Sequence, residues 1–158
     1  MKKGMIVFIG MLVLNACNDS APAKETPVVA NSDIANSLEG TWKLVSATTI
    51  KNTDTTVTDF AAGQEMIKVI NKSHFAFLRH DTNQGKDTAI FSAGGGTYTL
   101  DGDKYTELLQ YCNDRGWEGH TFSFTVSLKD DTLLQTGVEK LEKENVDQFI
   151  IEKYLRVK

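Results

Sequence analysis

The chain has few cysteines, which can cross-link a fold, and few prolines, which interrupt strands and helices. Its 158 residues include two cysteines and two prolines. Both prolines, Pro22 and Pro27, precede residue 38, so segment 38–158 contains none. Proline cannot donate to a hydrogen-bonded ladder and is confined mostly to sheet edges and bulges. Its absence favours a domain in which most backbone N–H groups are used in β-ladders.

Excess positive charge is also missing. The chain carries 17 Lys and Arg against 21 Asp and Glu, a formal net charge of −4. Nucleic acids and anionic lipid surfaces are bound through clustered basic residues. We therefore expect no nucleic-acid partner, and we expect any membrane attachment to be covalent rather than electrostatic.

Metal and nucleophile motifs are absent as well. The histidines His74, His80 and His120 show no H-x-H or H-E-x-x-H spacing, and there is no C-x-x-C pair. No G-x-S-x-G nucleophile elbow occurs. The sequence predicts no metal site, no cofactor and no catalytic residue.

No apolar run reaches the ~20 residues that span a bilayer. The longest, at 4–14, follows Lys2 and Lys3, an arrangement typical of a signal peptide. Ala16-Cys17 closes this segment and resembles the lipobox of bacterial lipoproteins, whose cysteine thiol is diacylated and becomes the first residue. The resemblance implies a signal peptide at 1–16, acylation of Cys17 (palmitate-type chains) and a lipid anchor in the bacterial cell envelope, at the outer membrane. An ordinary secretory signal with an incidental cysteine is the alternative.

Segment 17–37 is small and polar and contains both prolines, which predicts a flexible tether. If Cys17 is lipidated, Cys112 has no disulfide partner within the chain. We expect Cys112 to be a buried small side chain in a strand. A catalytic thiol is the alternative, although no histidine lies within a few residues of it.

Segment 38–158 fits one all-β domain. Short runs rich in β-branched and aromatic residues recur between turn signals, which is typical of a barrel or a sandwich. We predict strands at 41–50, 66–71, 74–81, 88–93, 96–100, 104–112, 120–130, 132–142 and 147–157.

The first and last of these strands carry a recognisable pair. The first opens with Gly40-Thr41-Trp42 and the last ends with Arg156. This combination resembles lipocalins and lipocalin-like domains, in which the arginine lies across the tryptophan and closes the barrel bottom. With the segment GGGTYTLDGDKYTE, the domain resembles small lipocalin-like domains of bacterial lipoproteins, mostly of undefined function. The resemblance implies a single antiparallel up-and-down β-barrel of about eight to ten strands, with structural roles for Trp42 and Arg156.

The glycines at 94–96 do not form a phosphate-binding loop. They are followed by the strand-like TYTL instead of Lys-Ser/Thr and a helix. Glycines beside a strand mark a bend, a bulge or a close approach of another backbone. We therefore expect a bend at 94–96 and a hairpin turn at the Asp-Gly-Asp that follows.

Alternate residues of a strand share a face, and on this basis we assign a barrel lumen. Glu107 is expected to pair with Arg79, because an unpaired buried carboxylate is costly. Trp117, in the loop 113–120, is either a lid at the barrel mouth or a residue folded onto the outside. The predicted ligand-binding residues are Phe75, Phe77, Arg79, Tyr98, Tyr105, Glu107, Tyr111 and Trp117. The alternative is a self-satisfied network that fills a small barrel.

The predicted function is binding or carriage of a small hydrophobic or amphipathic molecule. One alternative is a non-catalytic module with a filled barrel that binds another envelope protein. A weaker one is an isomerase- or hydrolase-like enzyme with Glu107 as general acid or base beside Arg79.

Overall fold

A computed structural model describes residues 38–60 and 62–158. The predicted signal peptide, Cys17 and the tether lie outside the described residues. No helix among the described residues has the length and apolar character to cross a bilayer.

The described residues form nine strands and two 3-10 turns. The strands are β1 (Gly40–Lys51), β2 (Asp54–Asp59), β3 (Gln64–Ile70), β4 (His74–Asp81), β5 (Phe91–Asp101), β6 (Lys104–Cys112), β7 (Thr121–Lys129), β8 (Thr132–Leu141) and β9 (Val146–Arg156). The turn η1 (Arg115–Trp117) joins β6 to β7, and η2 (Glu142–Glu144) joins β8 to β9.

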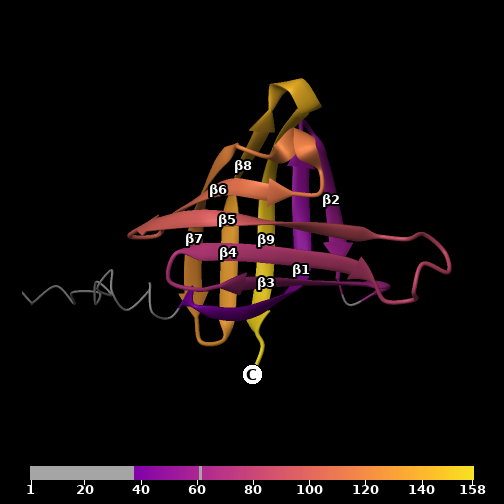
Figure 1. Ribbon diagram of the computed structural model, residues 1–158, viewed down its shortest axis with the longest axis horizontal. Coiled ribbons are helices and arrows are strands. Elements are labelled where there is room, and N and C mark those ends of the chain that lie inside the picture. The colour runs from indigo at the N-terminus through magenta and orange to yellow at the C-terminus, as the bar shows by residue number, and fades with distance from the viewer. Residues whose placement is uncertain (1–37, 61) are drawn as a thin grey trace, which may run out of the picture.

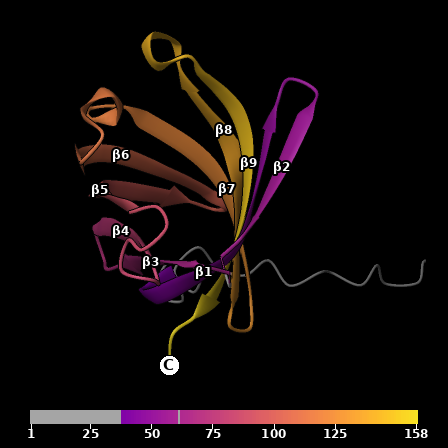
Figure 2. The ribbon, with the colours of Figure 1, turned by 90° about the vertical axis from the view of Figure 1, so that its right-hand side faces the viewer.

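Eight of these strands close into an antiparallel barrel. Strands β3 to β9 pair with their sequence neighbours, and β1 completes the ring by pairing with both β3 and β9. Strand β2 stays outside the ring and pairs with the second half of β1, on the edge opposite to β9, so that β1 and β2 form a hairpin beside β9 (Figures 1 and 2). The prediction of an all-β, up-and-down lipocalin-like barrel is confirmed.

Strict alternation of inward and outward side chains builds the wall. Along β9, Ile150, Glu152 and Tyr154 face the interior, while the residues between them face outward or are less buried. Strand β1 keeps its apolar face inward past a bulge between Leu44 and Ser46. Such bulges help a small sheet to curve enough to close.

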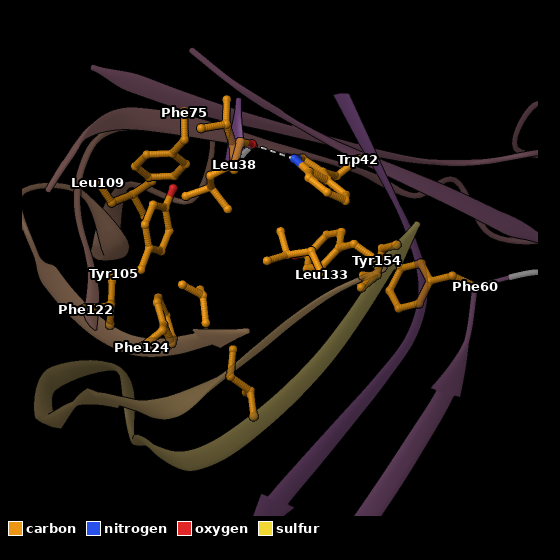
Figure 3. Close-up of a cluster of buried hydrophobic side chains, with 14 of the residues drawn as sticks. Leu38, Trp42, Phe60, Phe75, Tyr105, Leu109, Phe122, Phe124, Leu133 and Tyr154 are labelled. Atoms are coloured by element: carbon orange, nitrogen blue, oxygen red, sulfur yellow. Dashed lines mark hydrogen bonds between the residues drawn. The ribbon is translucent and has the colours of Figure 1, made fainter. Parts of the chain in front are cut away.

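A tryptophan and an arginine occupy the closed end of the barrel. Trp42 is fully buried, and its Nε1 donates to the carbonyl of Leu38 at 2.9 Å (Figure 3). Arg156, directly opposite Trp42 in the β1–β9 register, places its guanidinium carbon 4.0 Å from the centre of the indole ring. Its Nη1 donates to the carbonyl of Glu39 at 2.8 Å. Packing therefore fills this end, and the opposite end carries η1, η2 and the β1–β2 hairpin (Figure 2).

Candidate ligand-binding site

The barrel encloses a cavity of about 390 Å³ above its packed end. Volumes of this order accommodate small organic molecules. Its apolar walls are Leu44, Ala47, Phe60, Met66, Phe77, Leu109, Cys112, Trp117, Phe122, Phe124 and Ile150. Its polar walls are Thr49, Thr58, Lys68, Arg79, Ser92, Glu107, Asp114, Gln135, Glu139, Gln148, Glu152 and Tyr154. The cavity is thus amphipathic.

A buried lysine lies at the floor of this cavity. Lys68 is 2% exposed, and its Nζ donates to Glu107 Oε1 at 2.7 Å and to Gln135 Oε1 at 2.9 Å. The rings of Phe75, Tyr105 and Tyr154 surround the ammonium with centroids 5.5 to 5.6 Å away. A buried ammonium needs such partners, because desolvation of an unpaired charge costs several kcal/mol.

Two further carboxylates face the cavity from neighbouring strands. Glu152 on β9 lies opposite Gln135 on β8 and accepts a hydrogen bond from Tyr154 Oη at 2.6 Å. Glu139, nearer the mouth, accepts one from Gln148 Nε2 at 2.7 Å. Burial raises the pKa of Glu152 above its ordinary value and raises the pKa of Glu139 to about 7. Both side chains are partly exposed. The surrounding protein nevertheless desolvates them, which disfavours their charged forms.

The predicted pairing of Arg79 with Glu107 is wrong. Arg79 Nε donates instead to Gln64 Oε1 at 2.8 Å, and its guanidinium lies 5.3 Å from the ring centre of Phe60. Lys68 on β3 takes the place assigned to Arg79: it has the same parity as the inward Met66, and its Nζ reaches Glu107 on β6 through the barrel interior. The weaker enzyme hypothesis placed Glu107 beside Arg79, whereas the cation next to Glu107 in the structure is Lys68.

The prediction that Tyr111 lines the lumen is also wrong. Tyr111 is 70% exposed, whereas Leu109, two residues earlier, is buried. The β5–β6 register shifts here: Gly96 opposes Leu109 and Gly95 opposes Tyr111, which leaves Gln110 as an extra residue. This β-bulge reverses the alternation of β6, so Tyr111 faces out and Cys112 faces the cavity.

The other predicted residues divide between the cavity and the packed end below it. Phe77, Arg79, Glu107 and Trp117 line the cavity. Phe75, Tyr98 and Tyr105 belong to the packed end, where the two tyrosine rings lie 5.0 Å apart and Phe75 sits beside Tyr105 (Figure 3). The buried Tyr105 hydroxyl has no hydrogen-bond partner in the described part of the chain. Burial and the nearby charge of Glu107 raise the pKa of this hydroxyl.

Trp117 occupies the barrel mouth. It ends η1 and packs against Phe122 with the ring centroids 5.7 Å apart. Asp114 caps this turn by accepting from the backbone N–H of Gly116. Of the two placements considered for Trp117, the structure shows the one that faces the cavity.

Most polar cavity residues were not predicted from the sequence, among them Lys68, Gln135, Glu139 and Glu152. Each of them lies on the same face of its strand as buried apolar residues. Gln135, for example, shares a face of β8 with the buried Leu133 and Leu141. The sequence signal for these residues is a polar side chain at a position that strand alternation directs into the barrel. We had used alternation only to find the apolar faces.

Histidine and cysteine contribute little to the cavity. His74, His80 and His120 are exposed, and the cavity wall includes Cys112, whose thiol pKa burial raises. Within residues 38–60 and 62–158, no three His, Cys, Asp or Glu side chains are placed to hold a metal ion together.

Comparison with known proteins places this barrel in a family. No curated protein matches the chain. The family model described as "Lipocalin-like domain" matches residues 38–134, more than half of the chain, from β1 into β8. The chain therefore belongs to the lipocalin-like domain family.

Proposed function

We propose that this protein binds or carries a small amphipathic molecule in the barrel cavity and does not act as an enzyme. The observation that supports this most directly is the cavity of about 390 Å³, with aromatic walls around a polar floor. Lipocalin-like barrels as a family indicate small-molecule binding and are generally non-catalytic. An apolar body fits against Phe122 and Phe124, and a polar group reaches the side chains around Lys68.

The proposal includes a lipid anchor at Cys17 in the bacterial cell envelope, at the outer membrane. Its support is the Lys2-Lys3 start, the apolar segment 4–14 and the Ala16-Cys17 pair. Two or more acyl chains hold a protein stably on a bilayer. The tether at 17–37 then allows the barrel to reach ligands away from the membrane surface.

The binding proposal is tested with N-phenyl-1-naphthylamine, a neutral apolar fluorophore whose emission rises in dry cavities. The purified full chain is titrated beside Ala47→Phe, which adds a ring inside the cavity, and Val57→Phe, which adds the same ring on exposed β2. We expect the wild type and Val57→Phe to bind alike and Ala47→Phe to bind at least about tenfold more weakly, a difference of ~1.4 kcal/mol.

Circular dichroism checks that each variant is folded, and Ser92→Phe replaces Ala47→Phe if the latter is not. A wild type that leaves the fluorescence unchanged contradicts the proposal. If the Ala47→Phe variant binds the fluorophore as tightly as the wild type, the binding site is not in the barrel cavity. Either result favours the alternative of an envelope interaction module that uses the barrel exterior.

A further inference from the structure

We propose that the cavity selects a molecule whose polar end is an organic cation, an ammonium group on an apolar body. This inference rests on the proposed binding function and specifies the chemistry of its ligand.

The first argument is the charge of the cavity wall. Its charged residues are two cations, Lys68 and Arg79, and four acids, Glu107, Asp114, Glu139 and Glu152. Lys68 is paired with Glu107 and Gln135, and Arg79 donates from Nε to Gln64 and lies over the Phe60 ring. An anionic ligand would meet more acids than cations on this wall. A cationic ligand would meet complementary charge.

The second argument is the unused acceptor capacity of the cavity carboxylates. An ionised carboxylate offers about four acceptor sites. Lys68 donates to Glu107, Gln148 to Glu139 and Tyr154 to Glu152. The Glu107 side chain is 9% exposed, lines the cavity and lies close to the Tyr105 hydroxyl. An ammonium would bring three further donors to these carboxylates.

The raised pKa values of Glu139 and Glu152 agree with this reading. Desolvation is the largest cause for both, and Lys68 offsets it only in part. A bound cation would favour the ionised carboxylates and return their pKa values toward the ordinary range.

The cation must be organic rather than a metal ion. No three acidic, histidine or cysteine side chains in the described ranges converge on one metal position. The same cavity is lined by the aromatic rings of Trp117, Phe122 and Phe124, and Phe122 lies beside Glu107 in the β6–β7 register. Aromatic faces attract ammonium groups and also pack against apolar bodies.

The test compares three probes that share one body: 4-phenylbutylammonium, 4-phenyl-1-butanol and 4-phenylbutyrate. Isothermal titration calorimetry on the purified full chain near pH 7.5, where the amine is protonated, measures each affinity. We expect the ammonium to bind at least about tenfold more tightly than the carboxylate, with the alcohol between them.

Charge-removing variants show which residues carry that preference. Glu139→Gln and Glu152→Gln each keep an acceptor and are expected to weaken ammonium binding about five- to tenfold while leaving the alcohol unchanged. The matched control is Glu142→Gln on η2, an exposed glutamate outside the cavity wall, which is expected to bind all three probes like the wild type.

The outcomes separate this inference from the proposed function. If N-phenyl-1-naphthylamine and the alcohol bind but the ammonium has no advantage over the carboxylate, the cation preference is wrong and the cavity remains a binding site. If neither the naphthylamine nor any phenylbutyl probe binds, both fail. A preference that survives both cavity substitutions would also overturn the assignment.

Discussion

Lys68 is an ionised side chain at a position that strand alternation assigns to the barrel interior. Its ammonium is held by one carboxylate, one amide and three surrounding rings. Replacing a buried ion pair with apolar residues is often neutral or stabilising, so stability alone is a weak reason for the Lys68–Glu107 pair. In the proposed function, the pair has a second role, because it keeps Lys68 from attracting anionic ligands.

Glu139 gives the fold a pH dependence of predictable sign. Its pKa of about 7 in the folded state lies above the ordinary 4.5, mainly because of burial, with the charges of Glu152 and Glu107 adding to the shift. The donor Gln148 and the charge of Lys68 act in the opposite direction. The folded protein thus binds this proton more tightly than the unfolded chain. Its contribution to the free energy of unfolding is greatest below pH 4.5 and is lost as the pH rises toward about 7.

We therefore predict that the wild type loses about 1–2 kcal/mol of unfolding free energy between about pH 5.5 and about pH 7.5 because of Glu139. Urea denaturation at both pH values measures this loss. Glu139→Gln should reduce it, since the amide does not titrate, whereas Glu142→Gln should leave it intact. An identical pH dependence in wild type and Glu139→Gln would show that another group is responsible.

Strands β5 and β6 show how an element departs from its sequence pattern. The predicted break at the glycines is instead a continuous β5, and the irregularity lies opposite, in β6. A Cβ at Gly96 would overlap the carbonyl oxygen of Leu108, and one at Gly95 would lie 2.6 Å from the carbonyl oxygen of Phe75. The glycines thus allow the neighbouring strands to approach closely at the bulge.

Gly96→Ala is predicted to lower the unfolding free energy by more than about 3 kcal/mol, because the backbone of β6 must move. Gly102→Ala is the comparison: its φ of +61° is strained for alanine, but no atom lies within 4 Å of the new methyl group, so about 1 kcal/mol is expected. Urea denaturation compares the two. Equal losses would mean that the close approach at Gly96 does not constrain the barrel.

Strand β2 forms although its sequence shows no alternating apolar pattern. Its sequence, DTTVTD, is exposed along almost its whole length, and it was not among the strands predicted from the sequence. It is a strand because the second half of β1 offers a free edge, which β2 covers from Asp54 to Asp59. Pairing with β1, rather than an apolar face, determines this element.

At the scale of the whole molecule, one strand decides the topology. β1 pairs with β3 near its start and with β9 along most of its length, so the sheet closes and the Trp42–Arg156 contact fills one end. Closure removes most free edges and leaves the other end open over the cavity. Glu107, Glu139 and Glu152 lie on β6, β8 and β9, and the curvature of this part of the sheet turns them toward one interior.

The proposed anchor belongs to this scale because it concerns the chain outside the described barrel. Cys17→Ala is predicted to abolish incorporation of labelled palmitate and to move the protein from the membrane to the soluble fraction. Cys112→Ala should retain both properties, because Cys112 lies in the cavity wall and is not part of the lipobox-like segment. Continued labelling of Cys17→Ala would rule out Cys17 as the acylation site.

Local pattern by itself determined the all-β class, the approximate strands and the inward position of Glu107, because strand alternation and turn residues act over a few neighbours. The structural roles of Trp42 and Arg156 were implied by the resemblance to lipocalin-like domains. The tertiary structure decided the partner of Glu107, the outward turn of Tyr111, the pairing of β2 and the joining of Glu139 and Glu152 to one cavity. These depend on register, on a bulge and on ring closure, which relate residues that are distant in the chain. The set of polar side chains that line the cavity is therefore determined by the closed barrel and cannot be read from local sequence.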